Sequence, residues 1–404
     1  MQAQAEVHSA ANEDKIWTRD FIFICLANFF IFLSFQMALP TIPLFVEYLG
    51  ESEQFIGIIT GIFTFSALLI RPYAGSSLET KGRKFVYMIG VTVFTIAIGV
   101  FALLYSIFIL IILRIIQGLG WGFATTASGT IATDLIPPKR RGEGLGYFGL
   151  SGNLALALGP SLGLTLENYL SFTQLFIICG ILGLVSLLLA SQVRYKQGTP
   201  PSPNIQQVKK KKFDVYEKSA IEPSILLFFI TATLGGIATF LPLYTHSREI
   251  GGIEWYFLIY ALFLLISRTF SGRIYDQKGH IAVFLPGAVL VLIAMLLLAW
   301  LPNSTTLLIA AAIYGLGFGS VQPALQAWAV EKAPNNRKGM ANATFFSFFD
   351  LGVGVGALAF GQIAFMFNYS AIYIVGAGSV VFSILYYVYL LMKEKRKGQL
   401  VGKA

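Results

Sequence analysis

Two charged residues of this sequence lie deep inside apolar stretches. Asp350 is the only acidic residue well inside such a stretch, and Arg114 lies inside another. A buried arginine in a membrane span costs about 2.5–3.5 kcal/mol on insertion scales, so it should face protein or water and have a partner. A carboxyl group that is buried away from water can bind and release protons near neutral pH. The pattern predicts Asp350 as a proton-coupling residue and Arg114 as a fixed positive charge.

Both residues also have a purely structural interpretation. Asp350 could cap or bridge neighbouring helices, and Arg114 could bond to backbone carbonyl groups. Glu47 and Glu254 lie near the ends of apolar stretches and are further candidates for proton coupling. The residue types alone leave these alternatives open.

The composition places most of the chain in lipid. Of its 404 residues, 56% are hydrophobic and 12% are charged, whereas soluble domains have about 25% charged residues. A soluble enzyme is therefore excluded, and we expect no enzymatic activity. Cys25 and Cys179 belong to no CxxC motif or Cys/His cluster, and the sequence contains no Gly-x-x-x-x-Gly-Lys-Ser/Thr motif. We therefore expect no metal site, no disulfide, no cofactor and no direct use of ATP.

Twelve apolar stretches are long enough to cross a hydrocarbon core of about 30 Å, which needs roughly 20 residues per helix. The sequence therefore predicts an all-α membrane protein with 12 transmembrane helices. The predicted spans are 20–46, 55–78, 85–105, 107–133, 144–166, 171–191, 223–246, 253–275, 281–301, 305–331, 340–366 and 370–392. A polar, Pro-rich and basic segment divides them, so we predict an N-terminal six-helix bundle (1–191), a linker (192–222) and a C-terminal six-helix bundle (223–404).

The basic residues lie almost entirely on one side of this predicted topology. Of 29 Lys and Arg residues, only Arg248 falls in a loop on the other side. Because Lys and Arg accumulate in cytoplasmic loops, both termini and the linker are predicted to be cytoplasmic, in a bacterial-type cell membrane. The net charge of +9 thus belongs to the inner membrane face, and a nucleic-acid partner is not expected.

The two halves are related by a constant shift of 197 residues. Residues 71–82 align without a gap with 268–279, and residues 114–144 align with 311–341. The second alignment pairs Gly118 with Gly315, and Asp134 falls opposite Glu331. Both halves begin on the same side and contain six spans, so the repeats are parallel and should enclose a cavity near the midplane.

At these motifs the sequence resembles the major facilitator superfamily over nearly its whole length. The loop after the second span, Gly75-Ser-Ser-Leu-Glu79-Thr-Lys-Gly82-Arg83-Lys84, is similar to the family's G-x-L-A-D-R-x-G-R-K signature. Glu79 replaces the usual Asp and Thr80 the usual Arg, so a charge relay through that Arg is in doubt. We expect Gly75 to permit close backbone approach and Glu79 to lie at the N-terminal end of a helix.

This loop and its copy in the second half are predicted to close the inner side of the cavity. The alternative is a tight turn with a solvated basic loop. The predicted gating residues are Gly75, Glu79, Gly82, Arg83, Lys84, Gly272, Asp276 and Gly279.

Two further motifs resemble motifs of the family, and the second of them is found among its exporters. The segment from Arg114 to Gly118 is similar to R-x-x-Q-G, and Gly159-Pro160-Ser-Leu-Gly163 is similar to G-x-x-x-G-P-x-x-G. The resemblance implies proton-coupled antiport for the second motif. Glycines thin a helix and proline removes a backbone donor, so the fifth span should bend and pack closely. Pro40 and Pro43 resemble the ending of the first span in the drug-exporting branch.

In the family's fold, the first and fourth helices of each half line the cavity. Aromatic rings with a few amides there would form an adaptable, mostly neutral surface for amphipathic compounds. Any one of these residues could instead pack against protein or lipid. The candidates are Asn28, Phe32, Phe35, Gln36, Trp121, Thr125, Phe240, Tyr314, Phe318, Gln322 and Gln326.

We therefore predict a major facilitator fold of two pseudo-symmetric six-helix bundles. Its expected function is the export of small amphipathic organic compounds in exchange for protons, by a monomer in contact with membrane lipid. Two alternatives stay open at this point. One is a dedicated exporter of one metabolite, sugar or metal-chelating compound, and the other is a membrane receptor or scaffold that transports nothing.

Overall fold

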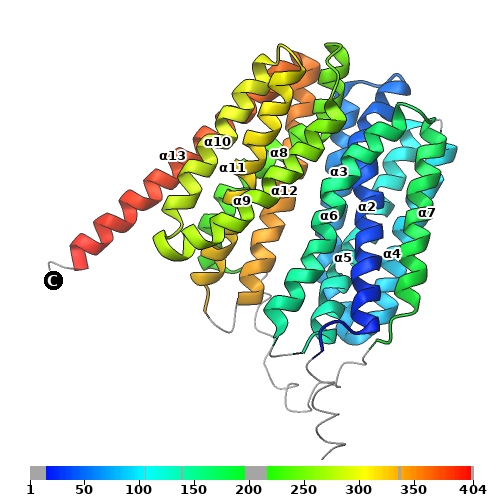
Figure 1. Cartoon of the computed structure of the whole chain (residues 1–404), viewed down its shortest axis with the longest axis horizontal. Helices are drawn as coiled ribbons and strands as arrows, with labels where there is room; N and C mark the ends of the chain where they lie inside the picture. The colour runs from blue at the N-terminus through cyan, green and yellow to red at the C-terminus, as the bar shows by residue number, and fades with distance from the viewer. Residues whose placement is uncertain (1–14, 105, 138–139, 196–215, 335–337, 402–404) are drawn as a thin grey trace, which may run out of the picture. The chain divides into compact units, whose positions relative to one another are not determined.

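The computed structural model describes residues 15–104, 106–137, 140–195, 216–334 and 338–401. Over these residues the chain forms twelve α-helices, two short 3-10 helices and no strand (Figure 1). The 3-10 helices are η1 (Phe101–Leu103) and η4 (Lys218–Ala220). The α-helices are α2 (Arg19–Tyr48), α3 (Glu53–Thr80), α4 (Arg83–Val100), α5 (Ile107–Leu135), α6 (Arg141–Glu167), α7 (Phe172–Ser191), α8 (Ile221–Ser247), α9 (Ile253–Lys278), α10 (Ile281–Trp300), α11 (Ser304–Glu331), α12 (Lys338–Met366) and α13 (Tyr369–Val401).

Each predicted span coincides with one of these helices, which confirms the all-α class. Two predicted ends differ from the structure. The span predicted to end at residue 105 leaves the α-helical conformation after Val100 and continues as η1. The last helix runs to Val401, nine residues beyond the predicted end at 392, because its charged continuation contains good helix formers.

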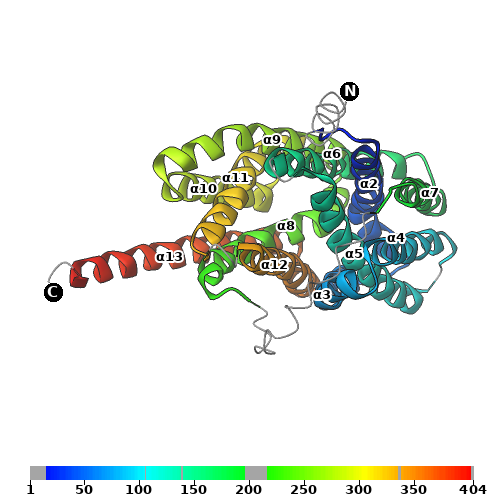
Figure 2. The same cartoon turned by 90° about the horizontal axis from the view of Figure 1, so that it is seen from below.

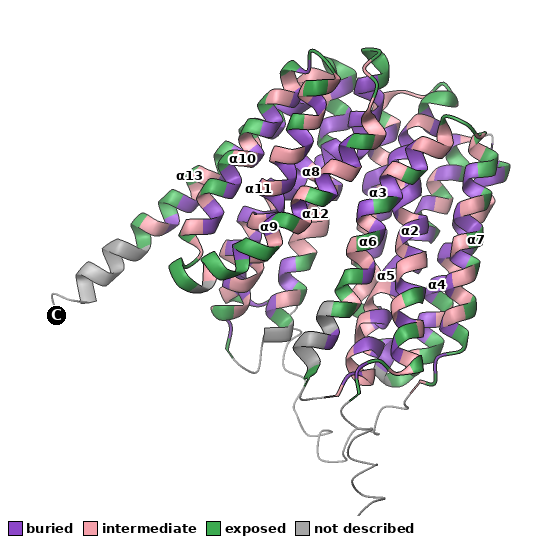
Figure 3. Ribbon diagram, viewed as in Figure 1, coloured by how far each residue is buried: buried purple, intermediate pink, exposed green. Residues whose placement is uncertain are grey.

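Eleven helices of the described chain are long and apolar enough to cross a membrane. The helix outside this group is α6, which is unusually rich in glycine and carries Pro160 inside it. Exposed residues recur along the helices (Figure 3). Large apolar residues among them include Leu69, Phe108 and Trp300. Apolar surface exposed on this scale marks contact with lipid rather than water.

Local signals start and stop several helices. The Ser171 hydroxyl accepts a hydrogen bond from the backbone N–H of Gln174, and the side-chain oxygen of Gln174 accepts one from the backbone N–H of Ser171. This pair is a capping box at the start of α7. Asn303 caps α11 by accepting a hydrogen bond from Thr306 N at 2.9 Å. Gly82 (φ +88°) precedes α4 and Gly279 (φ +74°) follows α9, both in backbone conformations that other residues rarely adopt.

The described residues of the chain form two compact units. Unit 1 contains Met1–Phe45 and Phe65–Val208, and unit 2 contains Val46–Thr64 and Lys209–Ala404. In unit 1, α4 packs against α5 and α7. In unit 2, α11 packs against α9 and α10, while α8 packs against α12 and α13 (Figure 2).

The 197-residue repeat reappears as the same helix contact in each unit. In unit 1, a Cβ atom at Gly120 would lie 3.0 Å from the carbonyl oxygen of Gly90. In unit 2, a Cβ atom at the equivalent Gly317 would lie 2.7 Å from the carbonyl oxygen of Gly287. Glycine at both positions lets two helix backbones approach closely, which is how membrane helices gain packing contacts.

A serine makes a matching bond in each unit. Ser186 on α7 donates a hydrogen bond to the carbonyl of Ala27 on α2 at 2.7 Å. Ser383, its mate under the same shift, lies on α13 and donates to the carbonyl of Leu226 on α8 at 3.0 Å. Such bonds hold helices together where lipid offers no alternative partner.

Candidate functional site

An aromatic cluster lies in unit 1, where α2, α4 and α5 meet. The rings of Trp121 and Phe35 stack with centroids 4.4 Å apart, and Phe32 lies 4.7 Å from Trp121. Phe94 on α4 adds a third contact to Trp121 at 5.5 Å. Three of the residues predicted to line a cavity are therefore in contact. Phe94 was not predicted, because it lies on the third span rather than on the first or fourth.

Amide groups lie on α2 near these rings. Asn28 is buried and its Nδ2 atom donates a hydrogen bond to Ser151 Oγ on α6 at 2.9 Å. Gln36 is 9% exposed, and its Oε1 atom accepts no hydrogen bond from any described residue. Buried amide oxygens normally have a partner, so this oxygen is suited to a water molecule or a donor group on a ligand.

The glycines of the exporter-like motif bring α6 against α2. A Cβ atom at Gly159 would lie 3.1 Å from the carbonyl carbon of Gln36. One at Gly163 would lie 3.0 Å from Cα of Met37. The predicted close packing of this motif is confirmed, and α6 remains helical through Pro160.

Arg114 lies on α5 and is 1% exposed. Its Nη1 atom donates a hydrogen bond to Oε1 of Gln117, one turn further along the same helix, at 2.7 Å. Gln117 itself is fully buried. Thr125, further along α5, donates its hydroxyl to the Trp121 carbonyl at 2.8 Å. The buried arginine thus has the polar partner that its cost in lipid requires.

In unit 2 the predicted cavity residues lie on α8 and α11. The hydroxyl groups of Tyr314 and Thr233 share a hydrogen bond of 2.9 Å, and the rings of Tyr314 and Phe318 stack at 5.7 Å. Tyr314 and Phe240 have no exposed surface, whereas Gln322 is 8% exposed. In this structure Phe240 and Tyr314 act as packing residues.

A chain of polar side chains crosses α9, α11 and α12 in unit 2. Arg268 donates a hydrogen bond from Nη2 to Gln322 Oε1 at 2.7 Å, and the Gln322 amide lies 3.5 Å from Gln326 Oε1. The Gln326 amide then donates to Asn342 Oδ1 at 3.0 Å. Sequence reasoning missed Arg268 and Asn342 as site residues. The repeat was the available signal, because Arg71 and Arg268 occupy equivalent positions inside two predicted spans.

The candidate carboxylates lie on three different helices. Asp350 is half-buried on α12, and Asn153, its mate under the repeat, is half-buried on α6. Glu254 lies in the first turn of α9, and Glu47 is exposed near the end of α2. Asp350 is therefore the one candidate that lies well within a helix.

The first predicted gating loop forms an ion pair within unit 1. Arg83 Nε lies 2.5 Å from Asp134 Oδ2, and both side chains are partly exposed. Lys84 Nζ lies 5.9 Å from the centre of the Tyr195 ring, and burial raises the pKa of the Tyr195 hydroxyl. The contact joins the start of α4 to the end of α5 and to the residues that follow α7. The partner of Arg83 was not predicted.

The predicted close backbone approach at Gly75 is wrong for this structure. Among the described residues, no heavy atom of a neighbouring group lies within 4 Å of a Cβ atom built at Gly75 or at Gly272. Both residues lie inside helices and face open space. Gly82 and Gly279, by contrast, are required by their positive φ angles. The side chains of Glu79 and Asp276 lie outside the described residues.

The second gating loop uses different chemistry. Tyr275 donates a hydrogen bond to Glu331 Oε2 at 2.7 Å. Glu331 is equivalent to Asp134, but the position equivalent to Arg83 is His280. The His280 ring stacks on Trp328 at 4.3 Å, and its Nδ1 atom lies 2.6 Å from the Tyr387 hydroxyl. The repeat thus preserves the acidic position and changes its partner.

The first turns of α3 pack on α12 within unit 2. The Gln54 amide donates a hydrogen bond to Gln362 Oε1 at 2.7 Å. A Cβ atom at Gly57 would lie 2.7 Å from the Ala357 carbonyl oxygen and 3.2 Å from Gly361 Cα. We call this contact the α3–α12 crossing, formed by Gln54, Gly57, Ala357, Gly361 and Gln362.

Lipid-facing apolar helices, a repeated unit and polar groups held between helices define a multi-pass membrane protein with the architecture of a secondary transporter. The family model described as Major Facilitator Superfamily matches residues 24–356 and, in a second match, residues 249–403. The chain belongs to the Major Facilitator Superfamily, and it is a transporter of that superfamily.

Its curated relatives cover nearly the whole chain. The uncharacterized MFS-type transporter MJ1560 of Methanocaldococcus jannaschii is 24% identical over 373 residues, covering 88% of this chain and 96% of the relative. The multidrug resistance protein MdtG of Escherichia coli is 27% identical and covers 92% and 94%. The quinolone resistance protein NorA of Staphylococcus aureus is 23% identical and covers 85% and 89%.

Solved structures show the same fold. A variant of the nucleoside transporter NupG superposes with a TM-score of 0.77 at 15% identity, covering 92% of this chain and 99% of that one. A POT family transporter in complex with 5-aminolevulinic acid gives a TM-score of 0.76 at 14% identity, covering 93% and 97%. At these identities the likeness concerns the fold alone.

Proposed function

We propose that this transporter exports small amphipathic organic compounds in exchange for protons. The α2–α6 crossing at Gly159 and Gly163 carries the proposal. At this crossing, the exporter-like motif on α6 packs against Gln36 on α2. The stacked rings of Phe35 and Trp121 lie beside it. Stacked aromatic rings with an amide oxygen bind flat, amphipathic molecules through dispersion and a few hydrogen bonds.

The relatives support the same substrate class. MdtG and NorA are named for multidrug and quinolone resistance. We extend that activity to this chain because each relative matches it over most of both sequences and because the buried rings and amides described above suit such compounds.

The proposed orientation has both termini in the cytoplasm of a bacterial-type cell. It is supported by the basic residues, which lie in the loops that the topology assigns to the inner face. In this orientation the Arg83–Asp134 ion pair lies at the inner face and the α3–α12 crossing lies at the outer face. We propose that these contacts form and break in alternation as the site opens to one side and then to the other.

Asp350 is the proposed proton carrier, with Arg114 as a fixed positive charge. Asp350 is half-buried in the middle of α12, where a carboxyl group is shielded from bulk water. Its repeat mate is the neutral Asn153, so only one of the two equivalent positions can ionise. A single titrating group in a repeated pair is a simple means of coupling one proton site to one substrate site.

Transport by the purified full-length protein in proteoliposomes tests the proposal. Vesicles with an acidic lumen should accumulate quinolones and amphipathic dyes while the lumen becomes more alkaline, because each substrate enters as protons leave. Accumulation only when the external medium is the more acidic would show symport and overturn the proposed direction. Vesicles without the protein provide the control.

The substrate panel separates the alternatives. It should include nucleosides and short peptides, since the structural neighbours transport such compounds. Movement of several unrelated amphipathic compounds supports multidrug export, and movement of one metabolite alone indicates a dedicated exporter. A protein that moves no compound and no protons would be a receptor or scaffold, which contradicts the proposal.

A further inference from the structure

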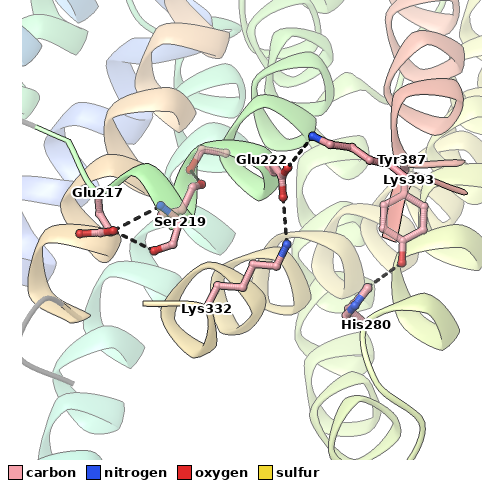
Figure 4. Close-up of polar contacts among 9 residues, drawn as sticks. Glu217, Ser219, Glu222, His280, Lys332, Tyr387 and Lys393 are labelled. Atoms are coloured by element: carbon pink, nitrogen blue, oxygen red, sulfur yellow. Dashed lines mark hydrogen bonds and ion pairs between the residues drawn. The ribbon is translucent and has the colours of Figure 1, made fainter. Parts of the chain in front are cut away.

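A cluster of lysines lies where α8 begins and α11 ends in unit 2. It consists of Lys218, Lys332 and Lys393, and we call it the lysine cluster. Lys332 Nζ lies 2.9 Å from Glu222 Oε2, and Lys393 Nζ lies 3.8 Å from Glu222 Oε1 (Figure 4). Two ammonium groups thus share one carboxylate. Lys218 is exposed, lies one turn before that carboxylate and lines the same hollow, so the three lysines outnumber it by two.

Two other acidic residues of the described chain have hydrogen-bond donors of their own. Glu217 is buried, and its carboxylate accepts two hydrogen bonds from Ser219 at 3.3 and 2.9 Å (Figure 4). Glu331, next to Lys332 in the sequence, accepts a hydrogen bond from Tyr275 on α9. The lysine cluster thus carries more positive than negative charge among the described residues, which favours an anion.

The lysine cluster borders an open hollow of about 640 Å³. Its lining consists of Lys218, Ser219, Ile221, Glu222 and Lys332. The hollow lies at the start of α8, where backbone N–H groups and the helix dipole also favour negative charge. Its volume accommodates a group as large as a glycerophosphate.

Aromatic side chains hold one of the lysines in place. Lys332 Nζ lies 4.5 Å from the centre of the Trp328 ring, and Trp328 stacks on His280. His280 in turn bonds to the Tyr387 hydroxyl on α13 (Figure 4). These contacts fix Lys332 relative to α10 and α13, so one of the three lysines has a defined position.

An apolar stripe on α13 leads directly to the lysine cluster. Large apolar side chains recur there every three or four residues and are all more than half exposed. They are Phe382, Leu385, Tyr389 and Met392, and Lys393 follows the last of them. Residues at this spacing share one face of a helix, so the stripe can lie along an acyl chain.

We infer that the lysine cluster binds the phosphate of an anionic phospholipid in the inner leaflet, with its acyl chains along the α13 stripe. A free phosphate would satisfy the lysines but would leave the stripe unused. Basic pockets between membrane helices on the cytoplasmic side favour such headgroups, and α13 continues into a basic segment, Lys393-Glu-Lys-Arg-Lys397. The inference uses the proposed orientation but is independent of the substrate and of proton coupling.

Native mass spectrometry of the detergent-purified full chain can measure this binding. The probes are phosphatidylglycerol and phosphatidylcholine with identical acyl chains. Loss of one lysine should weaken phosphatidylglycerol binding about fivefold, and the triple variant Lys218→Gln/Lys332→Gln/Lys393→Gln should weaken it by more than tenfold. Phosphatidylcholine binding should not change. Lys278→Gln removes an exposed lysine outside the hollow and is the matched control.

Two further measurements keep the test decisive. The triple Lys→Arg variant retains the charge and should retain binding, which separates charge from altered packing. If the triple glutamine variant does not fold, Lys218→Gln decides alone, because Lys218 makes neither of the Glu222 ion pairs described above. Equal phosphatidylglycerol affinity in the wild type and these variants would overturn the inference. So would displacement of the lipid by millimolar inorganic phosphate, which would indicate a site for the free anion.

Discussion

Substitution of Gly57 by alanine should open the α3–α12 crossing. The added Cβ atom would lie 2.7 Å from the Ala357 carbonyl oxygen and 3.2 Å from Gly361 Cα. Both neighbours are backbone atoms, so a whole helix must move rather than one flexible side chain. Overpacking of this kind costs about 1–3 kcal/mol. The population in which α3 lies on α12 should therefore fall relative to the open state by a factor of about 5 to 150.

The higher helix propensity of alanine does not change the expected ratio of the two states. Alanine favours a helix over glycine by about 1 kcal/mol, but α3 is helical whether or not it touches α12. The gain therefore applies to both states and cancels in their ratio. The matched control is Gly378→Ala on α13 of the same unit, because a Cβ atom there would meet nothing within 4 Å.

The assay is the rate at which a maleimide labels a cysteine placed at Ala357, which is fully buried in the crossing. The native Cys25 and Cys179 are first replaced by alanine so that only the reporter reacts. Gly57→Ala should raise the labelling rate at least fivefold, and Gly378→Ala should leave it unchanged. If a folded Gly57→Ala protein were labelled at the same rate as the reporter protein that keeps Gly57, the reasoning would be refuted.

Three other predictions follow from the site. Asp350→Asn should abolish the dependence of transport on the pH gradient; unchanged dependence in proteoliposomes would exclude Asp350 as the proton carrier. Asp134→Asn removes the partner of Arg83, and since both groups are partly exposed it should weaken closure of the inner side by about 0.2–1 kcal/mol. A cysteine placed on the inner side should then be labelled up to fivefold faster than in the wild type. Added salt should reduce this difference in rate, because it screens the ion pair. Trp121→Ala should lower the free energy of unfolding by about 3–5 kcal/mol. Trp121→Phe should keep the fold and change the ranking of substrates in competition assays. An unaltered ranking would show that Trp121 does not contact the substrate.

Part of the site was accessible from the sequence. Resemblance and spacing singled out Phe32, Phe35 and Trp121, and the structure brings these rings into contact. The close packing of Gly159 was also predicted, because a glycine next to a proline inside a span has few other uses. The fourth ring, Phe94, escaped prediction because apolar residues on a third span look alike whether they face lipid or a neighbouring ring.

Other features depended on contacts between distant segments. Arg268 lies inside a predicted span and is repeated at Arg71, but its bond to Gln322, 54 residues away, could not be predicted from either observation. The close backbone approach expected at Gly75 was wrong, because a sequence motif identifies the residue but not the neighbour that packs against it. Gly82 was predicted as a gating residue, with a tight turn as the alternative, and the structure shows that its own positive φ angle requires glycine there.

The sequence by itself determined that this chain is a twelve-helix membrane transporter of the Major Facilitator Superfamily, built from a parallel repeat. The twelve helices and the repeat follow from the length of apolar runs, the position of charges and an alignment of the chain with itself. The superfamily follows from the resemblance of its sequence motifs and from the match to the family model. Only the tertiary structure decided that Arg83 pairs with Asp134, that Gln36 packs against Gly159, and that Lys332 and Lys393 both pair with Glu222. Each of these contacts joins residues far apart in the chain, and a distance in space arises only when the helices pack.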